Sequence, residues 1–350
     1  MSVDDAQSAR TQPRAAAPTL EEVAALAGVS RSTASRALNG GKRVSPSAQA
    51  AVDAAIAQLG YTPNRAARSL VTRRTDSIAL VIPEPDERVL SDPFFSGTLN
   101  GLSSALAGSD LQLVLVISRP GESERTERYL RNGHVDGAVV VSHHKSDRLD
   151  TVLAESRIPA VFVGRPLNEV GRLHYVDVDN YGGGRLAAEH IIATGRKRIG
   201  MIAGPQDMAA GRDRLRGWID VLEAAGLETH RIVSSDFTAA TASDAASTLL
   251  DEHPDTDAIL AASDLIAAGA INVLLQRGRA IPEDVAIIGF DNLGVSTSPS
   301  LTTLTNPVVA MSRTAGQMLL DLLENGDRDP QHTQFSPDLV VRESTATGGA

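Results

Sequence analysis

From Ser77 onward, short apolar runs rich in β-branched residues alternate with amphipathic stretches, and this alternation constrains the fold more than any other feature of the chain. This alternation predicts parallel sheets covered by helices, because the helix between two parallel strands carries the chain back across the face of the sheet. About 270 residues of it predict two such lobes, with ligands bound beyond the carboxyl ends of the strands. The predicted strands are Ser77–Ile82, Leu111–Ile117, Gly137–Val141, Ala160–Val163, Tyr175–Val178, Arg198–Ile202, Ala258–Ala261 and Val285–Gly289, and the helices between them include Leu186–Thr194, Arg214–Ala225 and Leu265–Gln276.

The segment before this alternation has a helical pattern instead. Apolar residues recur at three- and four-residue steps from Leu20 to Ala27, which predicts one helix with an apolar face. Gly28 suits the left-handed residue that ends a helix. Ser30 predicts the N-cap of a second helix, about Arg31–Asn39. A third helix is predicted from the N-cap and proline of Ser45-Pro46 to Gly60.

Two short helices joined by a tight glycine turn and braced by a third are typical of a helix-turn-helix. The outward positions of the second helix are Arg31, Ser32, Ser35 and Arg36. Short polar side chains and arginines can reach base edges in the major groove of DNA. The alternative is a solvated helix in an ordinary three-helix bundle. The complete lack of acidic residues on the second helix favours DNA.

The charge distribution agrees with this interpretation. The net charge of −10 over 350 residues argues against nucleic-acid binding, but residues 1–75 hold ten Lys/Arg and five Asp/Glu. Residues 1–75, the head, therefore carry a net charge of +5, and the rest of the chain, the body, carries −15. This asymmetry indicates a DNA-binding head on an acidic body.

A basic, alanine-rich stretch, Tyr61–Leu70, follows the third helix. Leu70 has no apolar partner within this stretch, so it could act as a wedge between base steps of the minor groove. From the residues alone, a plain linker is an equally good interpretation.

These runs closely resemble the LacI/GalR family of bacterial repressors. The resemblance covers Thr19–Asn39, Val44–Pro46 and Leu59–Leu70. It implies that the outward residues of the second helix read the major groove and that residues flanking it help to contact DNA. It also implies that Leu70 is the wedge of a hinge helix. The predicted DNA-binding residues are Arg31, Ser32, Ser35, Arg36, Asn39, Arg43, Asn64, Arg65 and Leu70.

The resemblance extends to about residue 345 and implies a fold class. This fold is an N-terminal all-α helix-turn-helix head with a hinge helix, plus an α/β, two-lobed, periplasmic-binding-protein-like body. The motifs that carry the resemblance in the body are Pro93–Phe95, Asp136-Gly137, Gly164–Pro166, Val178–Asn180, Gly204-Pro205, Arg214–Gly217, Ser263-Asp264, Gly289–Asn292, Leu301–Thr303 and Val341–Ser344.

A small polar ligand requires charged groups on its hydroxyls and an aromatic plane against its apolar face. The resemblance implies that Arg214 clamps such a ligand and that Phe237 stacks on it. Asp291 follows a buried apolar run and is expected at the end of a strand. Core packing is the alternative for Phe95, and a solvated side chain is the alternative for Arg214. The predicted effector-binding residues are Phe94, Phe95, Arg214, Phe237, Ser263, Asp264, Asp291 and Asn306.

Departures from the family pattern bear on the ligand. Met208 and Ala210 stand where the purine-sensing branch has an arginine and a hydroxyl, so a sugar or sugar derivative is expected rather than a nucleobase. Asp92 replaces a common asparagine, and His143-His144 follow the third strand. Because no leucine heptads follow Ser344, a homodimer is expected rather than a tetramer.

Other classes fit less well. Gly182, Gly184 and Ala187 satisfy a G-x-G-x-x-A dinucleotide pattern, but no acidic residue ends the next strand to hold a ribose, and close helix packing explains the glycines better. A transport-type binding protein shares the body fold but would need an export signal, and the chain begins without one. A non-enzymatic, cytoplasmic regulator without cofactor or membrane span is therefore expected.

The predicted organisation has five parts. These are a disordered tail (1–18), the helix-turn-helix domain (19–63), the hinge (64–75), the effector-binding and dimerisation body (76–345) and a short tail (346–350). By linkage, ligand and operator DNA alter each other's affinity, and the sequence leaves the sign of that effect open.

Overall fold

The computed structural model divides into two compact units between Thr75 and Asp76. The described residues are 18–38, 44–62, 74–119, 121–168, 170–295, 297, 299–326 and 328–346, without the side chain of Ala239.

The first unit holds three helices, α1 (Leu20–Leu26), α2 (Arg31–Leu38) and α3 (Pro46–Leu59). Thr19 caps α1 in a capping box with Glu22, and Ser45 caps α3 ahead of Pro46. Gly28 has φ of 63°, the left-handed conformation predicted for it. The helices share a small core of Val23, Ala24, Ala34, Ala37, Val52 and Ala55.

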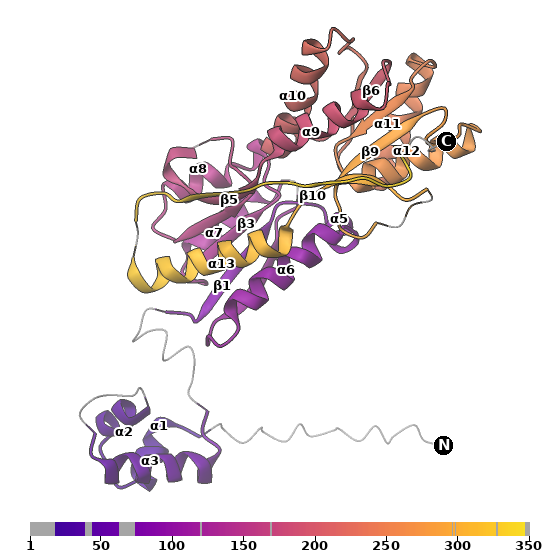
Figure 1. Ribbon diagram of the computed structural model, residues 1–350. Coiled ribbons are helices and arrows are strands. Elements are labelled where there is room, and N and C mark those ends of the chain that lie inside the picture. Colours follow the sequence, from indigo (N-terminus) through magenta and orange to yellow (C-terminus); the bar gives the residue numbers. More distant parts are fainter. Residues whose placement is uncertain are drawn as a thin grey trace, which may run out of the picture. The chain divides into compact units, whose positions relative to one another are not determined.

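The second unit consists of two α/β lobes, each built on a six-stranded sheet (Figure 1). In the first lobe the strand order is β11-β5-β4-β3-β1-β2, and every pairing is parallel. Its elements are β1 (Ser77–Ile82), α5 (Asp86–Ser91), α6 (Pro93–Leu106), β2 (Gln112–Ile117), α7 (Ser123–Arg131), β3 (Gly137–Val141), α8 (Leu149–Ala154), β4 (Ala160–Val163), β5 (His174–Val178), α13 (Val308–Asn325) and β11 (His332–Phe335), with two 3-10 turns, Lys145–Asp147 and Val170–Arg172.

In the second lobe the order is β12-β10-β9-β8-β6-β7, and only β12 is antiparallel to its neighbour. Its elements are α9 (Asn180–Ala193), β6 (Ile199–Ala203), α10 (Ala209–Ala224), β7 (Ile232–Ser234), α11 (Ala239–Glu252), β8 (Ala258–Ala261), α12 (Asp264–Gln276), β9 (Ala286–Asp291), β10 (Thr302–Thr305) and β12 (Leu339–Val340). The predicted fold class of the body is thereby confirmed.

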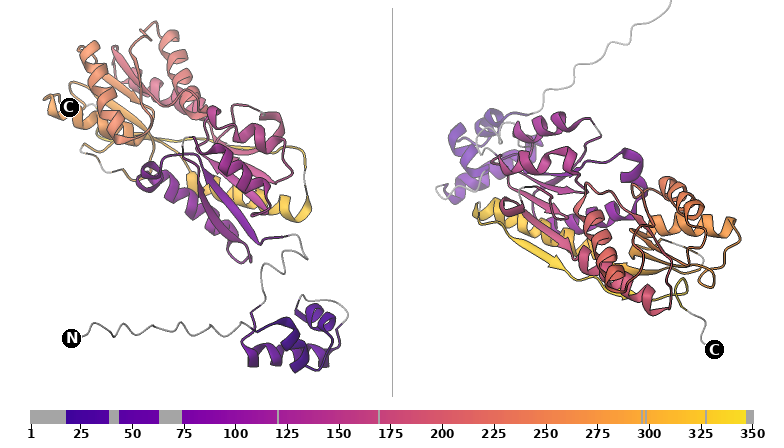
Figure 2. Two further views of the ribbon diagram at one scale, coloured as in Figure 1. Left: turned by 180° about the vertical axis from the view of Figure 1, so that it is seen from behind. Right: turned by 90° about the horizontal axis from the view of Figure 1, so that it is seen from above.

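The chain crosses between the lobes three times: after β5, after β10 and after β11. α13 therefore returns to the first lobe and lies along α6 in all three views (Figures 1 and 2). Gly101 of α6 allows the two helices to approach closely, because a Cβ at this position would collide with the backbone of Val309 in α13. These crossings form the connection between the lobes.

In the G-x-G-x-x-A pattern, Gly184 serves helix packing, as the sequence favoured, whereas a Cβ on Gly182 would meet the side chain of Asp179, which caps α9. A Cβ on Gly184 of α9 would meet the backbone of Arg214 in α10, and one on Gly217 of α10 would meet the backbone of Tyr181 in α9. This close contact brings α10, which carries Arg214, against the start of α9.

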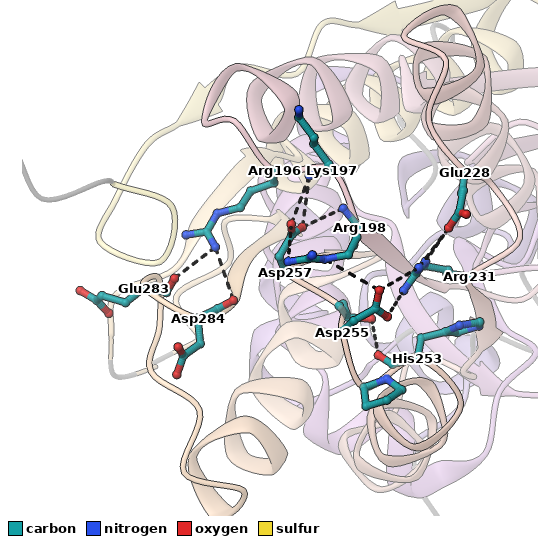
Figure 3. A network of polar contacts seen from close by, with 12 residues as sticks. Arg196, Lys197, Arg198, Glu228, Arg231, His253, Asp255, Asp257, Glu283 and Asp284 are labelled. Carbon is teal, nitrogen blue, oxygen red and sulfur yellow. Dashed lines mark hydrogen bonds and ion pairs between the residues drawn. The ribbon is translucent and has the colours of Figure 1, made fainter.

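Polar contacts connect the segments at the amino ends of the strands in the second lobe (Figure 3). Arg231 forms ion pairs with Glu228 and Asp255, and the backbone N–H groups of Lys197 and Arg198 donate to Asp257. Arg196 donates to the backbone carbonyls of Pro282, Glu283 and Asp284. These contacts hold the edge of the sheet opposite to the carboxyl ends of its strands.

Candidate functional site

A cleft lies at the carboxyl ends of both sheets, between the two lobes, with about 730 Å³ of space that protein atoms leave free, part of it open to solvent. This is where ligands bind in folds of this kind. The first lobe contributes Arg88, Asp92, Phe94, Ser142, His143, Val163, Gly164, Arg165, Asp177, Val178 and, from the returning α13, Met311. The second lobe and the crossings contribute Asn180, Met208, Ala209, Ala210, Arg214, Phe237, Ser263, Leu265, Asp291 and Asn306.

Most of the predicted effector-binding residues lie on this cleft. Two lie behind its wall: Phe95 is fully buried in the core with its ring 5.5 Å from that of Phe94, and Asp264 is buried and accepts a hydrogen bond from Thr303. The residues that line the cleft are Phe94, Arg214, Phe237, Ser263, Asp291 and Asn306.

Arg214 is a buried cation held from three sides. Its Nε donates to Asn180 Oδ1 at 2.9 Å, and its Nη1 donates to the carbonyl of Ala262 at 2.5 Å. Its guanidinium lies 3.6 Å from the centroid of the Phe290 ring. The side chain is therefore fixed in place before any ligand arrives.

The expectation that Arg214 opens its helix is wrong, because α10 begins at Ala209. Met208 precedes α10 and supplies no side-chain cap, so the sequence carries no signal for the true start. Arg214 lies in the second turn, where Gly184 lets α9 approach its backbone.

Asp291 ends β9 and pairs with Arg214 across 3.5 Å between Oδ1 and Nη2. The same Oδ1 accepts a hydrogen bond from Asn306 Nδ2 at 3.0 Å. Burial raises the pKa of Asp291 to about 6, although Arg214 and Asn306 both stabilise its ionised form. Asn306 Oδ1 is buried and accepts no hydrogen bond from the described residues, so this residue of the cleft wall has an unsatisfied acceptor.

Three residues of the cleft have a backbone conformation that side chains other than glycine rarely adopt. The φ angles of Ser142, Phe237 and Asp291 are 55°, 68° and 119°. Strain of this kind collects at binding sites, where the surrounding structure holds it. Phe237 is bulky, packs on Gly204 and has 7% of its surface exposed. The strained backbone of this residue therefore supports a ligand-contacting role.

Sequence reasoning missed several polar residues of the cleft. Arg165 and Asn180 fall inside motifs that carried the family resemblance, so those motifs were a usable signal. Burial raises the pKa of Asp177 to about 7, with Asn180 Nδ2 donating to its Oδ1 at 3.1 Å. Arg88 had no such signal, because only the fold brings it to the cleft.

One ion-pair group spans the lobes beside the cleft. His144 of the first lobe contacts Asp207 of the second with 3.0 Å between Nδ1 and Oδ2, and its Nε2 lies 3.2 Å from Glu84 Oε1. Burial alone would lower the pKa of His144, but the hydrogen bonds and charges of Glu84 and Asp207 raise it to about 9. His144 is therefore a cation at neutral pH that bridges the two lobes.

In the head, the outward side of α2 carries the predicted base-reading residues. Arg31, Ser32 and Arg36 are exposed and Ser35 is half-buried. Arg31 pairs with Glu21 at 2.5 Å, and Arg36 Nε donates to the Ser32 carbonyl at 3.1 Å. The other predicted DNA-binding residues, Asn39, Arg43, Asn64, Arg65 and Leu70, lie outside the described residues.

Two kinds of feature are absent from the described part of the chain. Within it, no helix is long and apolar enough to cross a membrane. The same residues contain no group of three or more His, Cys, Asp or Glu that could hold a metal ion.

A helix-turn-helix head joined to a two-lobed body with a polar cleft defines a ligand-controlled DNA-binding protein. Residues 19–64 match the family described as bacterial regulatory proteins, lacI family, and residues 188–345 match the periplasmic binding protein-like domain. The chain belongs to the LacI family of transcriptional regulators.

Individual relatives are similar over nearly the whole chain. The HTH-type transcriptional regulator CelR of Thermobifida fusca is 45% identical, over 93% of this chain and 98% of the relative. A structure of a CelR–cellobiose complex has 43% identity and a TM-score of 0.74, over 93% of this chain and 99% of that one. A lac repressor dimer bound to operator and the anti-inducer ONPF has 25% identity and a TM-score of 0.78, over 94% and 99%.

Proposed function

We propose that this protein is a repressor whose affinity for operator DNA is controlled by cellobiose or a closely related neutral disaccharide bound in the cleft between the lobes. The observation that carries the proposal is the cleft itself: a fixed Arg214 beside Asp291 and the open acceptor of Asn306, in a chain 45% identical to CelR. The relative's complex with cellobiose supports the choice of sugar.

The charges that line the cleft favour a neutral ligand. Its arginines are Arg88, Arg165 and Arg214, and each has a carboxylate partner: Glu84, Asp213 and Asp291. Burial lowers the pKa of His143 to about 4, so this residue adds no positive charge at neutral pH. Because no surplus cation is left for a phosphate, the cleft suits hydroxyl groups, which both donate and accept hydrogen bonds.

The proposed site consists of Phe94, Arg214, Phe237, Ser263, Asp291 and Asn306 for the sugar, and Arg31, Ser32, Ser35 and Arg36 for the bases of the operator. The proposal keeps the division into head, hinge (64–75) and body, with two copies of the chain acting on one palindromic operator. It makes the protein a binding protein rather than an enzyme, acting on chromosomal DNA in the bacterial cytoplasm.

The test is a measurement of operator affinity with and without sugar. A binding site is first selected from random DNA with the full-length protein, and fluorescence anisotropy then follows binding as cellobiose is added. We expect cellobiose to change the affinity by about 5- to 150-fold, the usual range for coupled sites. Glucose 6-phosphate serves as the charged comparison and should have no effect. An affinity that cellobiose leaves unchanged would contradict the proposal.

A further inference from the structure

Two ion pairs connect the lobes directly. In the first, His144 Nδ1 lies 3.0 Å from both carboxylate oxygens of Asp207. In the second, Arg165 pairs with Asp213 of α10. His144 and Arg165 follow β3 and β4, which are neighbours in the first sheet, and both acids belong to α10 or to the segment before it. One short piece of the second lobe therefore receives both contacts.

The first pair is accompanied by a bond between backbones. The N–H of Lys145 stands at the start of the 3-10 turn Lys145–Asp147, where a helical turn offers it no acceptor. It donates instead to the carbonyl of Asp207 at 2.9 Å. The N–H of His144 donates to Asp147 Oδ2 at 2.7 Å, which fixes the loop that carries the imidazole. We call His144, Lys145 and Asp207 the inter-lobe latch.

This latch can open without leaving a buried charge unpaired. Glu84, the other partner of His144, is 5% exposed but keeps Arg88 as a partner within the first lobe. Asp207 is 44% exposed, so water solvates its carboxylate when the lobes part. A partly exposed pair contributes modestly to stability, because water replaces much of the lost interaction. The inter-lobe latch is therefore suited to form in one arrangement of the lobes and to break in another.

The inter-lobe latch adjoins the cleft without being part of its wall. His143, which precedes His144, lines the cleft, and so does Met208, which follows the latch in the second lobe. A ligand that contacts both walls of the cleft favours the arrangement in which the lobes lie together. The latch forms in that same arrangement, so it acts on ligand affinity through the lobes rather than through a contact with the ligand.

We propose that the inter-lobe latch sets the fraction of the protein whose lobes are in the sugar-binding arrangement, which makes His144 and Asp207 positioning residues for the effector. The inference rests on the proposed function, since it names what regulates the same cleft. Because sugar and latch favour the same arrangement, losing the latch changes operator affinity in the direction opposite to adding sugar. This relation holds whether sugar weakens or strengthens operator binding.

The test compares Asp207→Ala with the wild type as full-length proteins. This change removes the carboxylate and keeps the backbone carbonyl that accepts from Lys145. We expect cellobiose affinity, measured by calorimetry, to fall about 3- to 10-fold, because a smaller fraction of the protein is competent to bind. Operator affinity without sugar, measured by fluorescence anisotropy, should shift in the direction opposite to the shift that cellobiose causes in the wild type.

A double-mutant cycle shows whether the effect passes through His144. In a His144→Gln background, Asp207→Ala should change cellobiose affinity by less than about twofold, because the partner is already gone. Asp86→Ala and Asp255→Ala are the matched controls, since each removes a partly exposed carboxylate that pairs with an arginine of its own lobe. Both controls should leave sugar and operator affinity unchanged.

The latch and the proposed sugar fail in different ways. Wild-type protein that binds cellobiose while Asp207→Ala binds it within about twofold of wild type contradicts the latch alone. A weaker sugar affinity with unchanged operator affinity, or an equal loss in the His144→Gln background, would show a local effect on the cleft and also overturn the latch. Wild-type protein that does not bind cellobiose contradicts the proposed sugar, and the latch with it.

Discussion

Arg214 carries its charge inside the protein, at 4% exposure, and three groups hold it there. The family motif located this residue without any structure, because the spacing Arg-Leu-Arg-Gly is local in sequence. Phe95, which was predicted to bind the effector but lies behind the cleft wall, shows where local patterns stop. Phe94 and Phe95 are neighbours on α6, and a helix turns about 100° per residue, so only one faces the cleft. Nothing in the sequence says which one.

At this scale, replacing Arg214 by Lys should abolish the response to sugar while operator binding survives. A lysine cannot reach Asn180, Ala262 and Asp291 together, since it lacks the planar fork of the guanidinium. We expect cellobiose affinity to fall at least about tenfold, measured by calorimetry alongside operator anisotropy without sugar. Arg212→Lys, on the exposed side of the same helix, is the control. An Arg214 variant whose operator affinity still changes with cellobiose as in the wild type would remove this residue from the site.

The base-reading residues give a second test at residue scale. Arg36 is exposed on α2, and an arginine in the major groove reads guanine through two hydrogen bonds. Arg36→Ala should cost about 1–3 kcal/mol at one base position and leave cellobiose affinity intact. Binding to a set of single-base operator variants measures this. Selectivity identical to wild type at every position would contradict the assignment.

Among the elements, strands that are continuous apolar runs were predictable, and short strands without such a run were not. β1, β3, β4 and β8 have the predicted bounds, because strands buried on both faces are continuous apolar runs. The short strands β7, β10, β11 and β12 were missed. β11 reads His-Thr-Gln-Phe and lies at the edge of its sheet, where neither composition nor length sets it apart from a loop. These late strands create the crossings, so the sequence pattern predicted two lobes but not how they are joined.

The ion-pair group of His144 connects the loop after β3 with the segment before α10, and it predicts a pH dependence. The ionisable groups that face His144 are Glu84, Asp207 and Asp147, with the neutral His143 next to it. The folded protein raises the pKa of His144 from 6.5 to about 9. Its contribution to stability is therefore complete below about pH 6.5 and is lost as the pH rises through about 9.

We expect the free energy of unfolding of the wild type to exceed that of His144→Gln by about 1–3 kcal/mol near pH 6, and the difference to shrink above about pH 9. Urea unfolding of both proteins across this range measures it. Subtracting one unfolding free energy from the other cancels the contribution of groups that titrate in both proteins. Asp177 and Asp264 are such groups, because burial raises their pKa values. A difference that does not change with pH would show that the bridge does not depend on the charge of His144.

For the whole molecule, charge and structure divide the chain at the same place. The net charge is +5 over residues 1–75 and −15 over the rest of the chain, and the compact units separate at the same place. The overall charge of −10 hides this, because it averages the DNA-binding head and the body that carries the cleft.

A fragment of residues 76–350 should therefore bind cellobiose as the full chain does and should not bind operator DNA at any salt concentration. The full chain should lose operator affinity steeply as salt rises, since its contacts to phosphates release counterions. Calorimetry and anisotropy on both proteins check this. Salt-sensitive operator binding by the fragment would place DNA contacts in the body.

The three crossings of the chain between the lobes have a consequence for how such proteins can diversify. Neither lobe is one continuous stretch of sequence, so a single recombination event within the body cannot exchange one lobe for that of a relative. The head, in contrast, ends at a single point and can be exchanged by one crossover near Thr75. One crossover there recombines a whole head with a whole body, whereas a new combination of the two lobes within the body needs more than one crossover.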